Sequence, residues 1–177
     1  IQINDADDID RDTTASYTLE ITISDGTAAV TEDVVITISD INDNTPEFDD
    51  DDNDGSTATA AATVTEGNTA VGTYDGTDSD SGDTLTYTIR TAAQDSTSVD
   101  AGDFSIVANT GVLTFSSAPD YDAPACGAGN NANTCVVVLR VSDGTNHDDI
   151  TVTVTVGDSN DQTPTFTGVD STPSAEE

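Results

Sequence analysis

The sequence has almost no positive charge. Three Lys and Arg residues stand against 35 Asp and Glu residues in a chain of 177, and the formal net charge is −32. A chain of this charge repels nucleic acid phosphates and anionic membrane surfaces alike. Neither is expected as a partner.

Long apolar runs and catalytic signatures are also missing. No stretch approaches the roughly 20 apolar residues that a membrane-spanning helix needs, so no membrane insertion is expected within this segment. The single histidine, His147, lies in a polar turn and is predicted to be a surface residue. No G-x-S-x-G, H-E-x-x-H or phosphate-binding loop occurs. We therefore expect no enzymatic activity.

Alternating apolar and polar residues predict β-strands in the parts of the chain that are not acidic. Residues 17–26 and 33–40 alternate in this way and are expected to form an antiparallel pair. The same pattern returns 118 positions later in residues 135–144 and 150–158, and this internal repeat is the main organising feature. The first pair places Tyr17, Leu19, Ile21, Ile23, Val34, Ile36 and Ile38 on one face, and the second directs Val137, Leu139, Val141, Val152, Val154 and Val156 inward.

Further strands are expected between the two copies. Residues 61–66, 70–78 and 85–90 are candidates, and residues 103–115 are interpreted as two strands around a turn at Asn109-Thr110-Gly111. About seven strands then lie between Pro46 and Asp158. This pattern predicts an all-β fold, a seven-stranded Greek-key β-sandwich of the immunoglobulin type, with no helix.

Both cysteines lie in what looks like an insertion. Asp10 and Asp12 correspond to Asp120 and Asp122 at an offset of 110 rather than 118, so eight residues have been inserted after the second pair. The insertion falls in CGAGNNANTC, and we predict that Cys126 and Cys135 close it as a disulfide-bound loop; two free thiols are the alternative. A disulfide indicates an oxidising compartment outside the cytoplasm.

Acidic turns recur at matching positions in the two copies. The segment DINDNTPEF at 40–48 returns as DSNDQTPTF at 158–166, TEG occupies 65–67, and DSDSG occupies 78–82. DRD and DYD match each other at 10–12 and 120–122, and SDG stands at 24–26 and 142–144. With these motifs in this order, the sequence resembles the cadherin repeat.

The resemblance implies a cadherin-type sandwich in a tandem array. Residues 1–44 would be the C-terminal part of one repeat, 45–163 a complete repeat, and 164–177 the start of a following one. Because two lone strands cannot bury a core, a strand from another subunit is an alternative way of completing the first part.

The clustered carboxylates indicate a metal ion independently of the family resemblance. Ca²⁺ takes six to eight oxygen ligands, and Asp, Asn and backbone carbonyls at strand ends supply them, whereas one His and two Cys are too few for a zinc site. Acidity is also typical of salt-adapted surfaces, but that would scatter the carboxylates instead of placing them at fixed offsets. We therefore predict Ca²⁺ as the bound metal.

The resemblance also implies which residues would hold Ca²⁺. Asp12 and Asp122 are one methylene shorter than the Glu usual at their position in cadherins. The ligands at the first junction would be Asp10, Asp12, Asp40, Asp43 and the Ile41 carbonyl on the preceding side, with Asn42, the Asn44 carbonyl, Asp78, Asp80 and Asp143 on the far side. Half of a second junction would consist of Glu66, Asp120, Asp122, Asp158, Asn160 and Asp161.

The acidic run DDDDNDG at 49–55 mimics the start of an EF-hand. With Gly55 at the sixth position of such a loop, the twelfth is Ala61 and not the bidentate Glu that the loop requires. We interpret this run as a solvated loop.

Two functions remain open. One is a spacer in an elongated surface or filament protein, extracellular or at the cell surface, whose inter-repeat junctions Ca²⁺ stiffens. The other is a calcium-dependent adhesion module that binds a copy of itself or another surface protein. Trp is absent and only four Phe and four Tyr are present, so no aromatic anchor for a partner is visible, which favours the spacer. The scarcity of Lys and Arg is more typical of a microbial or marine surface protein than of an animal cadherin.

Overall fold

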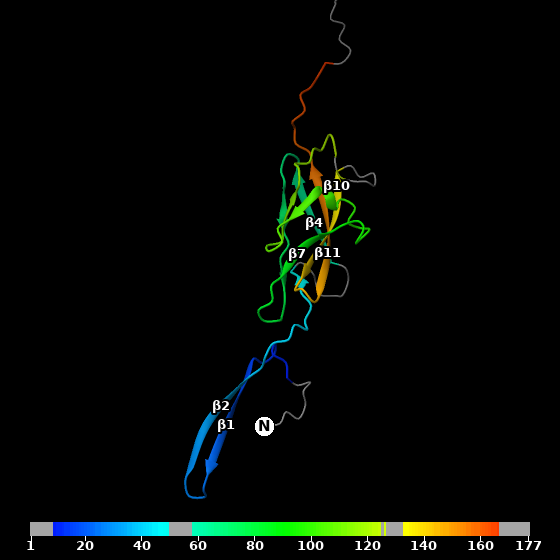
Figure 1. Ribbon diagram of the computed structural model, residues 1–177. Coiled ribbons are helices and arrows are strands. Elements are labelled where there is room, and N and C mark those ends of the chain that lie inside the picture. The colour runs from blue at the N-terminus through cyan, green and yellow to red at the C-terminus, as the bar shows by residue number, and fades with distance from the viewer. Residues whose placement is uncertain (1–8, 50–57, 125, 127–132, 167–177) are drawn as a thin grey trace, which may run out of the picture.

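The computed structural model describes residues 9–49, 58–124, 126 and 133–166. All its regular elements there are β-strands, apart from one turn of 3-10 helix at Ala101–Asp103. Figure 1 shows a two-stranded hairpin, coloured blue, extending from one end of a larger β-structure. The acidic loop predicted at 49–55 lies outside the described residues except for Asp49, and of the segment 164–177 only 164–166 are described.

The hairpin consists of β1 (Ser16–Ser24) and β2 (Ala29–Thr37), which confirms the predicted antiparallel pair. Leu19 pairs with Val34 and Tyr17 with Ile36, so the apolar side chains gather on one face. That face is open to solvent: Leu19 is 37% exposed and Ile23 is 75% exposed. Within the described residues, β1 and β2 form a sheet of their own.

The main sheet has the order β4-β11-β10-β7. Its central strands are β10 (Thr134–Ser142) and β11 (His147–Gly157), which pair antiparallel as predicted. Strand β7 (Thr86–Arg90) pairs antiparallel with β10 on one side. On the other side β4 (Ala58–Thr65) runs parallel to β11, a pairing that the sequence did not predict.

The second layer contains β5 (Ala70–Thr73), β9 (Val112–Phe115) and β8 (Phe104–Ile106) in that order. Two short strands, β3 (Glu47–Phe48) and β6 (Gly76–Thr77), pair with each other. The seven predicted strands correspond to β4 through β11 if β5 and β6 count as one strand broken in two, and β3 was not predicted. The predicted turn between β8 and β9 is also present, with Gly111 at a φ of 63°.

The core lies between these layers. Val137, Leu139 and Val152 are fully buried, as the alternation predicted, and they share one apolar cluster with Leu113 and Phe104 of the second layer. Burying such side chains is worth about 1.5 to 3 kcal/mol each, which makes this cluster the main source of stability.

The two cysteines form the predicted disulfide. Cys126 and Cys135 are joined with their Cα atoms 5.2 Å apart, and the bond ties the segment before β10 to the core. Free thiols are therefore excluded. Cys135 is fully buried and Cys126 is 7% exposed.

Candidate metal centre

Four acidic or amide-rich segments meet where the hairpin joins the sandwich. They are the turn at residues 10–12 before β1, the linker at 40–44 after β2, the loop at 78–83 after β6, and the turn at 142–146 between β10 and β11. The fold brings them together because the β6–β7 loop and the β10–β11 turn lie at the end of the sandwich that the linker enters.

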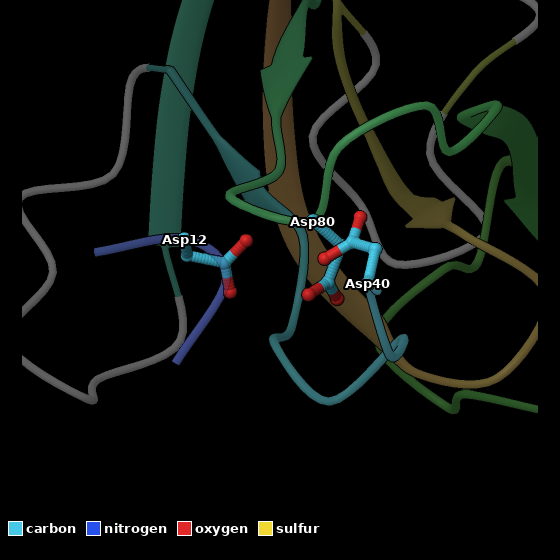
Figure 2. A group of neighbouring side chains, drawn as sticks. All are labelled: Asp12, Asp40 and Asp80. Atoms are coloured by element: carbon cyan, nitrogen blue, oxygen red, sulfur yellow. The ribbon is translucent and has the colours of Figure 1, made fainter. Parts of the chain in front are cut away.

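Two groups of three carboxylates form at this junction. Asp12, Asp40 and Asp80 make one group, and Asp78, Asp80 and Asp143 make the other, with one oxygen of each residue within 4.8 Å of the others in its group. Figure 2 shows the first group, in which the carboxylates come from three separate segments and lie around a common space. Asp80, only 5% exposed, belongs to both groups.

Several oxygens at the junction are buried without a hydrogen-bond donor. Five side-chain N or O atoms in the described part of the chain are in this condition, and four of them are oxygens here: Asp40 Oδ1, Asn42 Oδ1, Asp78 Oδ2 and Asp143 Oδ2. A buried acceptor without a partner costs about 1 to 3 kcal/mol. Four such oxygens at one place match the ligand set of a hard cation, so the residues fit Ca²⁺.

Two of these carboxylates are fixed by their own turns. Asp143 Oδ1 accepts the backbone N–H groups of Thr145 at 2.5 Å and Asn146 at 2.6 Å, and Asp78 Oδ1 accepts that of Asp80 at 2.9 Å. In both residues the second oxygen is the buried one without a partner. Each turn therefore orients one free carboxylate oxygen before any ion binds.

The pKa values reflect the crowding of like charges. Burial raises the pKa of Asp12, and the nearby charges of Asp40 and Asp80 raise it further, although a hydrogen bond from Asn44 opposes them. For Asp143, burial acts to raise the pKa, but the turn amides and the Asn42 side chain together outweigh it and the pKa is lowered. Asp143 therefore stays ionised to a lower pH than Asp12.

Asp83 is an acidic neighbour that the sequence analysis did not select. It accepts a hydrogen bond from Asn42 Nδ2 at 2.6 Å. Burial and the charges of Asp80 and Asp78 raise its pKa. Its position three residues after Asp80, at the end of the D-x-D loop, was the only available signal.

Asn44 connects the two sides of the junction. Its side-chain amide donates to Asp12 Oδ2 at 2.5 Å and to Asp80 Oδ1 at 2.8 Å, and its backbone N–H donates to Asp80 Oδ2 at 2.9 Å. Its carbonyl, which the resemblance implied as a ligand, accepts a hydrogen bond from Asn146 Nδ2 at 2.7 Å and keeps a second lone pair.

Five of the residues implied as ligands at the first junction lie outside both groups. Asn42 and Asn44 are described above, and the other three are Asp10, Ile41 and Asp43. Asp10 uses both carboxylate oxygens locally, for the Asp12 backbone N–H and the Thr13 hydroxyl. Asp43 is exposed and Ile41 is 71% exposed. The roles of these residues as ligands stay predictions, as do those of the residues in the two groups.

The residues predicted for a second junction lie at the opposite end of the sandwich. Glu66 is 7% exposed, and its carboxylate accepts the backbone N–H groups of Tyr121 at 2.7 Å and Ser159 at 2.6 Å. Asp120 Oδ1 accepts the Asp122 N–H at 2.9 Å, the same bond that Asp10 makes at the first junction. The described residues of this end, including the exposed Asp158, Asn160 and Asp161, contain no group of three carboxylates as close as the two above.

Several solved structures have the same fold as this chain over most of its length. The EC22–24 fragment of mouse cadherin-23 matches 85% of the chain with a TM-score of 0.60 and 21% sequence identity. The extracellular cadherin domains 3–6 of protocadherin gamma B2 match 90% of it with a TM-score of 0.61 and 22% identity. The chain has the cadherin fold. The human desmocollin-1 ectodomain matches 84% of it with a TM-score of 0.60 and 25% identity.

What the chain shares with these structures is the cadherin fold. The chain spans 45% of the cadherin-23 fragment, 38% of the protocadherin and 27% of desmocollin-1. No protein-family model and no curated protein matches the sequence. Among the described residues, no helix has the length and apolar character needed to cross a bilayer.

Proposed function

We propose that this chain is a calcium-binding segment of an extracellular or cell-surface protein built from tandem cadherin-like repeats, and that Ca²⁺ stiffens the junction between them. Residues 1–44, 45–163 and 164–177 are then parts of three successive repeats. The observation that carries the proposal is the set of four buried oxygens without donors at the first junction. The cadherin fold and the disulfide support a location outside the cytoplasm.

The role of each residue follows from its segment. Asp12 belongs to the turn before the hairpin, Asp40 to the linker, and Asp78, Asp80 and Asp143 to loops of the sandwich. Bound Ca²⁺ would supply the positive charge that offsets the repulsion among these carboxylates. Since they come from both sides of the linker, holding them together limits the motion of one side against the other.

A substitution that keeps the turn and removes the charge tests this proposal. Asp143→Asn retains an Oδ1 acceptor for the turn amides but replaces the buried free oxygen by an amide. We expect calorimetric titration to show at least a tenfold loss of Ca²⁺ affinity.

A matched control exists in the hairpin. Asp25 accepts the N–H groups of Thr27 and Ala28 at 2.9 Å each, as Asp143 accepts those of Thr145 and Asn146. It lies in the turn between β1 and β2, at the end of the hairpin away from the linker that follows β2. The Asp25→Asn variant should bind Ca²⁺ at the first junction with an affinity within twofold of that of the unsubstituted chain. Equal losses in the two variants would show that general acidity, not the junction, attracts the ion.

A further inference from the structure

Two turns of the chain have nearly the same sequence and the same conformation. SDGTA occupies residues 24–28 and SDGTN occupies 142–146, again 118 positions apart. In each, the serine hydroxyl donates to the carbonyl of the fifth residue, at 2.9 Å in the first turn and 2.7 Å in the second. The third-position glycines have φ angles of 92° and 101°. The turn therefore forms equally with Ala or Asn at its fifth position.

The fifth residue of the second turn contacts the linker. Asn146 Nδ2 donates to the Asn44 carbonyl at 2.7 Å, across 102 positions of sequence, and the contact is partly buried. Two residues further on, Asp148 Oδ2 accepts the backbone N–H of Phe48 at 3.2 Å. The corresponding residues of the hairpin are Ala28 and Val30, whose side chains have no polar group. This pair of contacts is therefore a feature of the second copy alone.

The hydrogen bond from Asn146 is made to Asn44, the residue that connects the two sides of the first junction. Asn44 reaches Asp12 through its side-chain amide and Asp80 through both its side-chain and backbone N–H groups. A peptide carbonyl fixed by Asn146 limits rotation of the linker about Asn44, and the orientation of its side chain is limited with it. The whole set consists of hydrogen bonds within the protein, so it exists without an ion.

We propose that Asn146 is a positioning residue that holds the linker in its metal-binding conformation before Ca²⁺ binds. We call the hydrogen bond from Asn146 to the Asn44 carbonyl the tether. Its effect on Ca²⁺ affinity rests on the proposed function, whereas the tether itself does not. Pre-ordering matters because ligands fixed in advance do not lose conformational freedom when the ion binds. No role as a ligand is required of the Asn146 side chain.

Asn146→Ala tests the proposal, and it recreates the SDGTA turn that the hairpin already forms. Hydrogen exchange by NMR on metal-free protein reports the tether through the backbone amides of Asn44 and Phe48, which donate to Asp80 and Asp148. We expect these two amides to exchange about three- to tenfold faster, the effect of losing one typical hydrogen bond. The Thr145 amide inside the turn should be unchanged. Ca²⁺ affinity, measured by calorimetry, should fall by a similar factor.

The reverse substitution is the control. Ala28→Asn adds the same amide to the hairpin turn, where no described linker residue lies within hydrogen-bond reach, and it should alter neither measurement. Unchanged exchange at Asn44 and Phe48 in Asn146→Ala would overturn the tether. Faster exchange with unaltered Ca²⁺ affinity would overturn the positioning role. If the unsubstituted chain does not bind Ca²⁺, the proposed function fails and the exchange measurement alone decides on the tether.

Discussion

At the scale of single residues, the two oxygens of one carboxylate can have different roles at the junction. Asp78 and Asp143 each use one oxygen to close a turn and leave the other buried and free. The first role needs only an acceptor, whereas the second needs a negative charge. An Asn at either position therefore preserves the backbone and removes the charge, so effects on folding and on ion binding can be told apart.

The raised pKa values of Asp12 and Asp83 predict how metal-free protein responds to acid. Both lie above the ordinary Asp value of 3.8, so the folded protein takes up protons at these groups before the unfolded chain does. As the pH falls from 7 through these raised values toward 3.8, repulsion is relieved and the melting temperature should rise. Below 3.8 it should fall, because Asp143 and Asp10 have lowered pKa values and lose their turn hydrogen bonds when protonated.

Scanning calorimetry between pH 7 and 3 checks this prediction. The many other carboxylates also relieve repulsion when they are protonated, so the double variant Asp12→Asn/Asp83→Asn is the necessary control. It should begin with a higher melting temperature at pH 7 and show a smaller rise. A rise of the same size in both proteins would assign the effect to net charge and not to the junction.

Among the described glycines, Gly111 is the one at which an added Cβ would meet the closest neighbouring atom. A Cβ at this position would lie 2.1 Å from the carbonyl oxygen of Tyr74, and the φ of 63° already disfavours other residues. Tyr74 N–H also donates to the Gly111 carbonyl at 3.1 Å, so the two segments cannot move apart without losing this bond. We expect Gly111→Ala to lower the free energy of unfolding by about 2 to 4 kcal/mol. Urea denaturation measures it, with Gly102→Ala, which meets no atom within 4 Å, as the control.

At the scale of elements, the disulfide closes a short segment at the start of β10. A loop of about ten residues stabilises by roughly 2 to 3 kcal/mol in the chain-entropy model. We expect reduction to lower the melting temperature while the sandwich persists, because the apolar cluster contains many other buried side chains. Thermal denaturation with and without reductant, followed by circular dichroism, is the measurement. Loss of the native spectrum at 25 °C on reduction would show that the disulfide is essential to the fold.

Strand prediction succeeded where alternation was strong and failed where side chains were small. The pairs β1–β2 and β10–β11 followed from their runs of Val, Ile and Leu. Strand β4 (ATAAATVT) begins with small residues, so the sequence indicated only its end, and its parallel pairing with β11 had no local signal. Strand β3 and the break between β5 and β6 were missed for a similar reason, since two-residue strands carry no period.

The candidate site shows a different limit. The acidic motifs identified Asp12, Asp40, Asp78, Asp80 and Asp143, because each lies in a short pattern with fixed spacing. Asp83 and Asn146 belong to no such pattern. Their roles depend on contacts with Asn42 and Asn44 across 41 and 102 positions, which only the folded chain reveals.

At the scale of the whole molecule, we predict that Ca²⁺ changes the rigidity of the chain more than its fold. The apolar cluster does not depend on the junction, whereas the carboxylates from the two sides of the linker repel one another without an ion. Small-angle scattering should therefore show a broader range of shapes and a changed maximum dimension in chelator, with the same β-sheet content by circular dichroism. Asp143→Asn should show a much weaker response to Ca²⁺. Identical scattering curves with and without chelator would contradict the prediction.

The parallel pairing of β4 and β11 has a mechanical consequence. These strands lie near the two ends of the sandwich sequence, and they are aligned over eight residue pairs from Ala58 with Ile150 to Thr65 with Gly157. Tension applied through the linker before β3 and the segment after β11 pulls the two strands in opposite directions along their length. The hydrogen bonds between them are then loaded in shear and must fail together, whereas an antiparallel terminal pair joined by a turn would open one bond at a time. In a stretched array, this sandwich would resist extension as a unit.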